Sequence, residues 1–134
     1  MNWLPRKNCP LTPSDPHAYA RMEQFISVEQ SYFSGPALEL LKVTWKREGY
    51  GPEQVAIARP LLERAVAIAS HHLAKNDYFA GSQFSLADIS WMPYVEGLAG
   101  TEFKELVLSQ PAFAAWWARV SERPSWRKVS GRAA

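Results

Sequence analysis

The segment that most constrains the fold is YFAGSQFSLADISWMPYV, residues 78–95. Within it, Ser85 stands three residues before Asp88, which is the spacing of a capping box. In that motif the Ser hydroxyl accepts the backbone N–H of the residue three positions on, here Asp88, and the Asp88 carboxylate accepts the backbone N–H of Ser85. Phe84 and Ile89 occupy the two positions of a hydrophobic staple. We therefore expect a helix to begin at residue 86, and we assign all four side chains a structural role.

A Ser and an Asp on one short segment could also suggest a hydrolase. No His lies near them in the sequence, and no strand pattern leads into the turn, whereas a Ser nucleophile needs an adjacent base. The cap alone accounts for both side chains. The helix that follows is apolar on nearly all sides, which is typical of a central, buried helix, and Pro93 is expected to bend it.

Helical periodicity continues through the rest of the chain, and strand signals are scarce. We expect an all-α bundle of roughly five to seven helices. The expected layout is an irregular lead-in over residues 1–14, one helical domain over 15–130 and a short tail over 131–134. Asp15 or Ser14 is the expected N-cap of the first helix.

Proline and glycine positions set the expected helix limits. The first helix should begin at Pro16, and Gly35 and Pro36 should interrupt it. A long helix should follow from about residue 52 to about residue 75, with Pro60 kinking it or delaying its start. We assign the apolar residues of that helix to one buried stripe, comprising Val55, Ala58, Leu61, Leu62, Ala65, Ile68, Ala69, His72 and Leu73.

Charge and cysteine content narrow the class of protein. The net charge is +2, and the single cysteine, Cys9, excludes an internal disulfide, which fits a reducing compartment. The sequence has no secretory apolar region at its N-terminus and no run near the roughly 18 apolar residues of a membrane span. The cationic C-terminus has a single aromatic residue, Trp126, among its basic residues and no series of stacking positions, so we interpret it as a solvated end. We expect a soluble cytoplasmic protein that binds neither membrane nor nucleic acid.

Three quoted segments resemble the all-helical C-terminal domain of soluble glutathione transferases. YFAGSQFSLADISWMPYV resembles the loop, capping box and central helix of that family. QPAFAAWWARVSERPSWRKV is similar to its closing helices, and LTPSDPHAYARMEQFISVEQSYF to the entry into its first C-domain helix. The resemblance covers roughly residues 11–130, and the Pro-Tyr of the central helix and the Trp pair favour the phi-like branch.

The resemblance implies that the two domains of such an enzyme have different roles. In such enzymes an N-terminal thioredoxin-like domain binds glutathione and supplies the Ser, Tyr or Cys that activates its thiol. The helical domain supplies one wall of the pocket for the apolar electrophile and much of the dimer interface. This sequence resembles only the second part, and residues 1–8 look like the end of the domain that would precede it. We therefore expect no catalytic residue and no cofactor in the isolated chain, with glutathione bound only if a thioredoxin-like domain is supplied.

The resemblance also suggests ligand-binding residues. Phe33 matches a position that lines the electrophile pocket in phi-like members, and Tyr32 and Tyr94 are added because of their nearness to that wall. The alternative for Phe33 is an ordinary core aromatic. The histidines at 17, 71 and 72 predict no metal site, because adjacent helical residues point about 100° apart and no Cys or Glu stands at ligand spacing. Cys9 is interpreted as an ordinary thiol, with a reactive one as the alternative.

Three functions remain open at this level. The first is a helical domain that binds an apolar small molecule, including an electrophilic one, and takes part in glutathione conjugation only with a thioredoxin-like domain. The second is a non-catalytic interaction module of the same fold. The third is a stand-alone enzyme with divergent chemistry. An uncovered apolar face favours either a homodimer or a thioredoxin-like partner.

Overall fold

The computed structural model describes residues 10–131, and every regular element in this range is helical. In chain order the elements are α1 Pro16–Val28, the π-helical η1 Glu29–Phe33, α2 Ser34–Thr44, α3 Pro52–Leu73, α4 Leu86–Ala99, α5 Lys104–Leu108, α6 Pro111–Ser121 and α7 Pro124–Val129. Strand-type pairing within residues 10–131 amounts to one isolated bridge between Tyr78 and Gly81. The all-α prediction is confirmed. The predictions for Cys9 and residues 1–8 lie outside the described residues.

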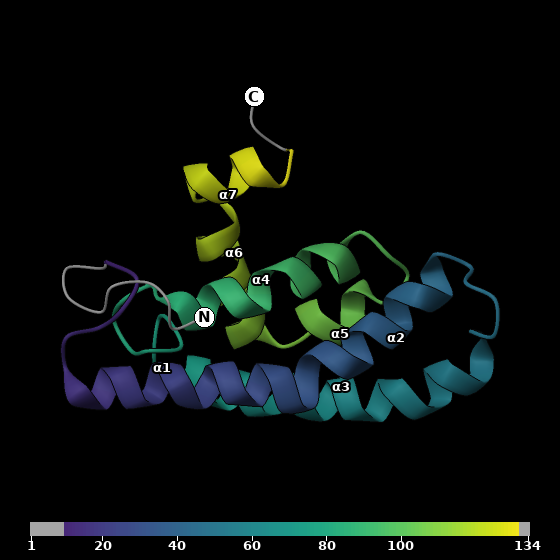
Figure 1. Ribbon diagram of the computed structural model, residues 1–134, viewed down its shortest axis with the longest axis horizontal. Helices are drawn as coiled ribbons and strands as arrows, with labels where there is room; N and C mark the ends of the chain where they lie inside the picture. Colours follow the sequence, from purple (N-terminus) through teal and green to yellow (C-terminus); the bar gives the residue numbers. More distant parts are fainter. Residues whose placement is uncertain (1–9, 132–134) are drawn as a thin grey trace.

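The bundle is built on a helical hairpin (Figure 1). The elements α1, η1 and α2 follow one another, and α3 returns alongside them, packed against η1 and α2. Helix α4 packs on α1 and α2, and α5 and α6 fill the space between α4 and α3. Helix α7 stands off the end of α6 (Figure 1). Among residues 10–131, no helix is both long and apolar enough to cross a bilayer.

The long helix α3 tolerates its internal proline. It begins at Pro52 and continues through Pro60 to Leu73, so the predicted start near residue 52 is confirmed and the alternative of a later start is wrong. Pro60 cannot donate to the carbonyl four residues earlier, at Ala56. Both residues are exposed, so water can satisfy that carbonyl.

The expected interruption at Gly35 and Pro36 takes a different form. Both residues lie inside α2, and the irregularity comes earlier, as the π-helical turn of η1. There the backbone N–H of Ser34 donates to the carbonyl of Glu29, five residues back. A proline ring clashes with the carbonyl four residues before it in an α-helix. The wider turn just ahead of Pro36 lets the helical path continue.

Aromatic side chains fill the centre of the bundle. Phe79, Trp91, Phe113 and Trp116 are fully buried, with neighbouring ring centroids about 5 to 6 Å apart. Trp91 comes from α4, which is buried along most of its length, as its apolar sequence predicted. Side chains from α4, α6 and the loop after α3 thus pack into one tryptophan-rich centre, which fixes how these segments are oriented.

Candidate functional site

The cap of α4 is a buried hydrogen-bonded junction. The backbone N–H of Ser85 donates to Asp88 Oδ2 at 2.9 Å, and Ser85 Oγ accepts the backbone N–H of Ala87 at 3.2 Å. Asp88 Oδ1 accepts the indole N–H of Trp116 at 2.7 Å and the backbone N–H of Phe79 at 3.3 Å. Burial raises the pKa of Asp88, while these donors oppose that rise. Ser85 and Asp88 are completely enclosed, so the geometry gives them a structural role.

The two staple residues lie at the edge of the same junction. Phe84 and Ile89 are both partly buried against the core. The ring of Phe84 meets Tyr78 edge-on, with centroids 6.1 Å apart, and the Arg123 guanidinium lies 3.8 Å from its centroid. Phe84 therefore also attaches the end of α6 to the loop before α4.

The three predicted ligand-contacting aromatics are divided between two places. Phe33 is fully buried, with its ring centroid 4.4 Å from Trp91 and 6.3 Å from Tyr94. Tyr94 is partly exposed on α4. Phe33, Trp91 and Tyr94 form what we call the aromatic wall. Tyr32 is 60% exposed and lies on the α3 side of η1, away from the wall.

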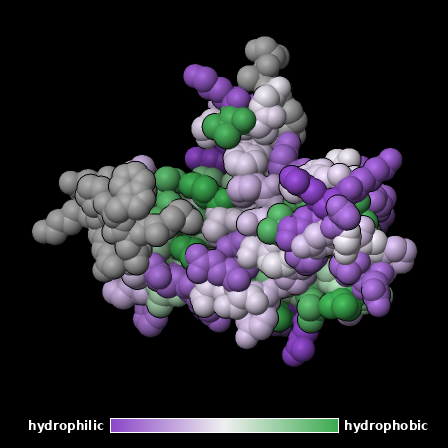
Figure 2. Space-filling view, turned by 45° about the vertical axis from the view of Figure 1, so that its right-hand side comes forward, coloured by the Kyte–Doolittle hydropathy of each residue, from purple (hydrophilic) through white to green (hydrophobic). Residues whose placement is uncertain are grey.

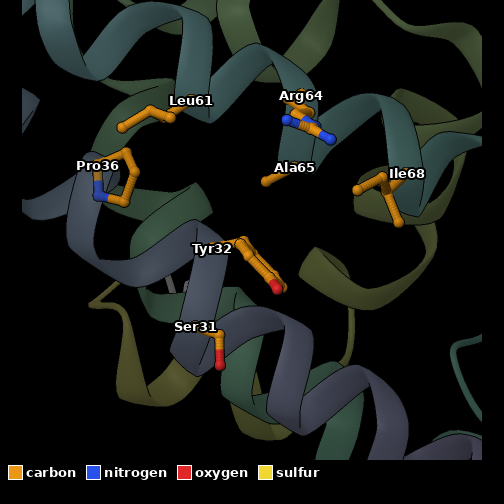
Figure 3. Close-up of a pocket in the computed structure, with 7 residues that line it drawn as sticks. All are labelled: Ser31, Tyr32, Pro36, Leu61, Arg64, Ala65 and Ile68. Carbon is orange, nitrogen blue, oxygen red and sulfur yellow. The ribbon is translucent and has the colours of Figure 1, made fainter.

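Tyr32 lines a groove between η1 and α3 (Figure 3). The groove has a volume of about 420 Å³ and is lined by Ser31, Tyr32, Pro36, Leu61, Arg64, Ala65 and Ile68. A second hollow of about 310 Å³ shares Pro36 and Leu61 with it and adds Gly35, Glu39, Gln54, Ile57 and Ala58. We call the two together the α3 groove. Its lining is mainly apolar and comes from η1, the start of α2 and α3.

The α3 groove corrects one sequence prediction. Leu61 and Ile68 were assigned to a buried stripe, but they are 50% and 43% exposed, and Ile57 beside them is 65% exposed. Residues such as Ala58, Leu62 and Ala65 form the stripe that is buried. The apolar pattern of α3 is wider than one buried face, and this width is the sequence signal for the exposed groove. Figure 2 shows such apolar patches set among hydrophilic side chains.

Glu29 is a site residue that the sequence reasoning missed. It begins η1 and is only 4% exposed, on the helical face that also carries the buried Phe25 and Phe33. Within residues 10–131 its carboxyl has no hydrogen-bond or ion-pair partner. Burial raises its pKa to about 7. The available signal was a Glu in the middle of an apolar stripe, four residues from an aromatic on either side.

A polar hollow lies at the opposite end of α1. His72 donates from Nε2 to the carbonyl of Phe79 at 2.9 Å, which leaves Nδ1 as the acceptor for Arg21 Nη1 at 3.3 Å and Asn76 Nδ2 at 3.4 Å. Burial lowers the pKa of His72. His17 and His71 are exposed. Among residues 10–131, no group of three or more potential ligands is arranged to hold a metal ion.

The order of the helices and the buried cap of α4 are those of a glutathione transferase-like helical domain. The profile of the family described as "Glutathione S-transferase, C-terminal domain" matches residues 17–124. The chain therefore belongs to this family.

Individual relatives point to the phi branch. Glutathione S-transferase F11 of Arabidopsis thaliana is 33% identical over 120 residues, covering 86% of this chain and 56% of the relative. The structure of glutathione S-transferase III in its apo form superposes with a TM-score of 0.83 at 27% identity, covering 90% of this chain and 57% of that one. Glutathione transferase F2 of Populus trichocarpa shares the fold, with a TM-score of 0.82 at 23% identity, covering 91% and 60%. The chain thus spans about half the length of the curated relatives it matches.

Proposed function

We propose that this chain is the helical half of a phi-type glutathione transferase and holds an apolar, electrophilic small molecule against the aromatic wall. Glutathione conjugation then requires a thioredoxin-like domain, joined to the chain or supplied by a partner. The observation that carries the proposal is the contact of Phe33 with Trp91 and Tyr94, at ring-centroid distances of 4.4 and 6.3 Å.

The wall suits a flat apolar ligand. Phe33 is held rigidly by Trp91, and Tyr94 keeps part of its ring at the surface. An arene packed against such rings gains about 25 cal/mol per Å² of buried apolar area, together with favourable ring contacts. Phe33 and Trp91 are fully buried, so Tyr94 presents the exposed part of the wall. A second element must cover a ligand packed there to bury it fully.

The wall does not supply what a thiol needs to react. Thiolate formation is favoured by nearby cations, by helix N-termini and by hydrogen-bond donors. The buried acid of η1 is Glu29, whose carboxylate would raise the pKa of a nearby thiol. Thiol activation is therefore assigned to the thioredoxin-like domain.

A ligand titration of the chain tests the proposal. Chlorodinitrobenzene is added while the tryptophan indole N–H signals are followed by NMR. We expect the Trp91 signal to move, and we expect Tyr94→Ala to weaken binding by about fivefold, or about 1 kcal/mol. Tyr32→Ala is the matched control, because Tyr32 lies in the α3 groove, and it should leave binding unchanged. Binding that is weakened by Tyr32→Ala and not by Tyr94→Ala would contradict the proposal.

A second function, assembly with another copy of the chain, is favoured by the α3 groove. Ile57, Leu61 and Ile68 expose apolar surface along one side of α3, which is typical of an interface. Arg64 lines one end of the groove, and Glu39 lines the other. In a two-fold dimer each contact occurs twice, so an antiparallel copy centred near Leu61 would set each Arg64 against the other copy's Glu39.

A further inference from the structure

Glu29 and Asp88 are both buried acids, but their surroundings differ. Asp88 accepts hydrogen bonds from Ser85, Phe79 and Trp116. No group in residues 10–131 donates a hydrogen bond to the Glu29 carboxyl, and the residue is only 4% exposed, with its small exposed area including the carboxyl oxygens. A buried carboxylate without partners is strongly destabilising. The cap explains Asp88, whereas nothing in the described fold uses the Glu29 carboxyl.

The position of Glu29 links it to the aromatic wall. The indole N–H of Trp91 donates to the carbonyl of Phe25 at 3.1 Å, and the Trp91 rings pack on Phe33 at 4.4 Å. Glu29 lies about one turn after Phe25 and one turn before Phe33, on the same face. The Trp91 side chain therefore runs along the stretch of helix that contains Glu29. Glu29 therefore lies between the two helical turns that contact Trp91.

The local backbone is also unusual. Glu29 is the first residue of η1, the π-helical turn in which the Ser34 N–H reaches back to the Glu29 carbonyl. Single π-helical turns within α-helices are rare and occur frequently at functional sites. Two independent features, an unpartnered buried acid and a widened turn, thus coincide next to the wall.

We propose that the Glu29 carboxylate is the polar recognition group of the aromatic wall and binds ligands that join an arene to a protonated amine. This rests on the proposed function, since the arene is taken to pack on Phe33 and Tyr94. A carboxylate is an acceptor only, and its strongest hydrogen bonds are those from charged N–H donors. An ammonium group would supply both the missing donor and the missing positive charge. The rise of the Glu29 pKa to about 7 agrees with a carboxyl that is largely surrounded by apolar groups.

The experiment compares two probes of nearly the same shape. Phenethylamine carries an ammonium group and phenethyl alcohol a neutral hydroxyl, and both are titrated into the chain at about pH 8, where the carboxyl is ionised. Binding is followed through the Trp91 indole N–H signal. We expect the amine to bind about tenfold more tightly than the alcohol. Glu29→Gln, which keeps the size of the side chain, should abolish this preference and leave alcohol binding unchanged.

Glu53→Gln provides a matched control, because Glu53 is an exposed acid of α3, and it should retain the tenfold preference. Equal binding of both probes to the unmodified chain would overturn the inference and leave the proposed function standing. A Glu29→Gln variant that still prefers the amine would also overturn it. If neither probe binds, both proposals fail. The preference for the amine is also measured after a thioredoxin-like domain is joined to the chain. If the preference is then lost, the Glu29 carboxylate pairs with a cation of that domain and not with a ligand, which would likewise overturn the inference.

Discussion

The indole N–H of Trp116 donates to the Asp88 carboxylate across 2.7 Å and so ties α6 to the first turn of α4. The same carboxylate accepts the backbone N–H groups of Ser85 and Phe79. One buried side chain thus holds two helices and a loop together. Because the aromatic wall takes Trp91 and Tyr94 from α4, the junction also positions the candidate site.

Asp88→Ala should destabilise the fold severely. It leaves three buried donors without an acceptor, at roughly 1–3 kcal/mol each, so we expect a loss of about 3–5 kcal/mol. Urea unfolding followed by tryptophan fluorescence measures it. Ser85→Ala removes one capping acceptor and should lose only about 1 kcal/mol. Equal, small losses for the two variants would show that Asp88 is not the centre of the junction.

Lys46→Gly should stabilise the chain. Lys46 follows α2 with a φ of 53°, and the N–H of Arg47 donates back to the carbonyl of Lys42 at 3.0 Å, as in a left-handed helix C-cap. A side chain in this conformation costs about 1 kcal/mol, and glycine avoids the cost. We expect a gain of about 0.5–1 kcal/mol in the free energy of unfolding. Lys46→Ala keeps a Cβ and should gain nothing; a similar gain from alanine would refute the explanation.

Glu29→Gln should change how stability depends on pH. The folded-state pKa of Glu29 is raised from 4.5 to about 7, so the folded chain holds a proton that the unfolded chain releases earlier. Its contribution to stability is fully present below about pH 4.5 and is lost as the pH rises through about 7. The variant should therefore gain on the order of 2 kcal/mol relative to the unmodified chain between about pH 4.5 and pH 8. Thermal unfolding at both pH values measures the gain. A difference that does not vary with pH would contradict a raised pKa.

Charge reversal in the α3 groove tests assembly. We expect sedimentation equilibrium to show a dimer that Leu61→Glu weakens at least about tenfold. Arg64→Glu should weaken the dimer as well, because it places two acids opposite each other. Adding Glu39→Arg should restore the dimer, because the pair of opposite charges is then formed again with the charges exchanged. Val129→Glu, at an exposed apolar position on α7, serves as the control. The interface is excluded if the unmodified chain is a monomer, or if Leu61→Glu leaves the dimer affinity unchanged.

Local signals in the sequence predicted much of the fold. The cap of α4, the start of α1 at Pro16 and the buried course of α4 follow from spacing within a few residues. The π-helical turn could not be predicted in this way, because it depends on how Pro36 is accommodated within a packed hairpin.

The candidate site was only partly predictable. Tyr32 and Phe33 were grouped, although neighbouring helical residues point about 100° apart and cannot share one wall. The separation of Tyr32 from Phe33 could therefore have been predicted from the sequence. The pairing of Phe33 with Tyr94 was a matter of tertiary packing between η1 and α4, to which no local pattern points. The unpartnered state of Glu29 likewise depends on what surrounds it in space.

Conjugation of glutathione to chlorodinitrobenzene tests the central claim most directly. It is measured for the chain alone and for the chain joined to the thioredoxin-like domain of a phi-type relative. We expect the chain alone to show only the uncatalysed rate, the joined protein to turn over, and Tyr94→Ala in the joined protein to raise KM. Turnover by the chain alone above the uncatalysed rate would contradict the account.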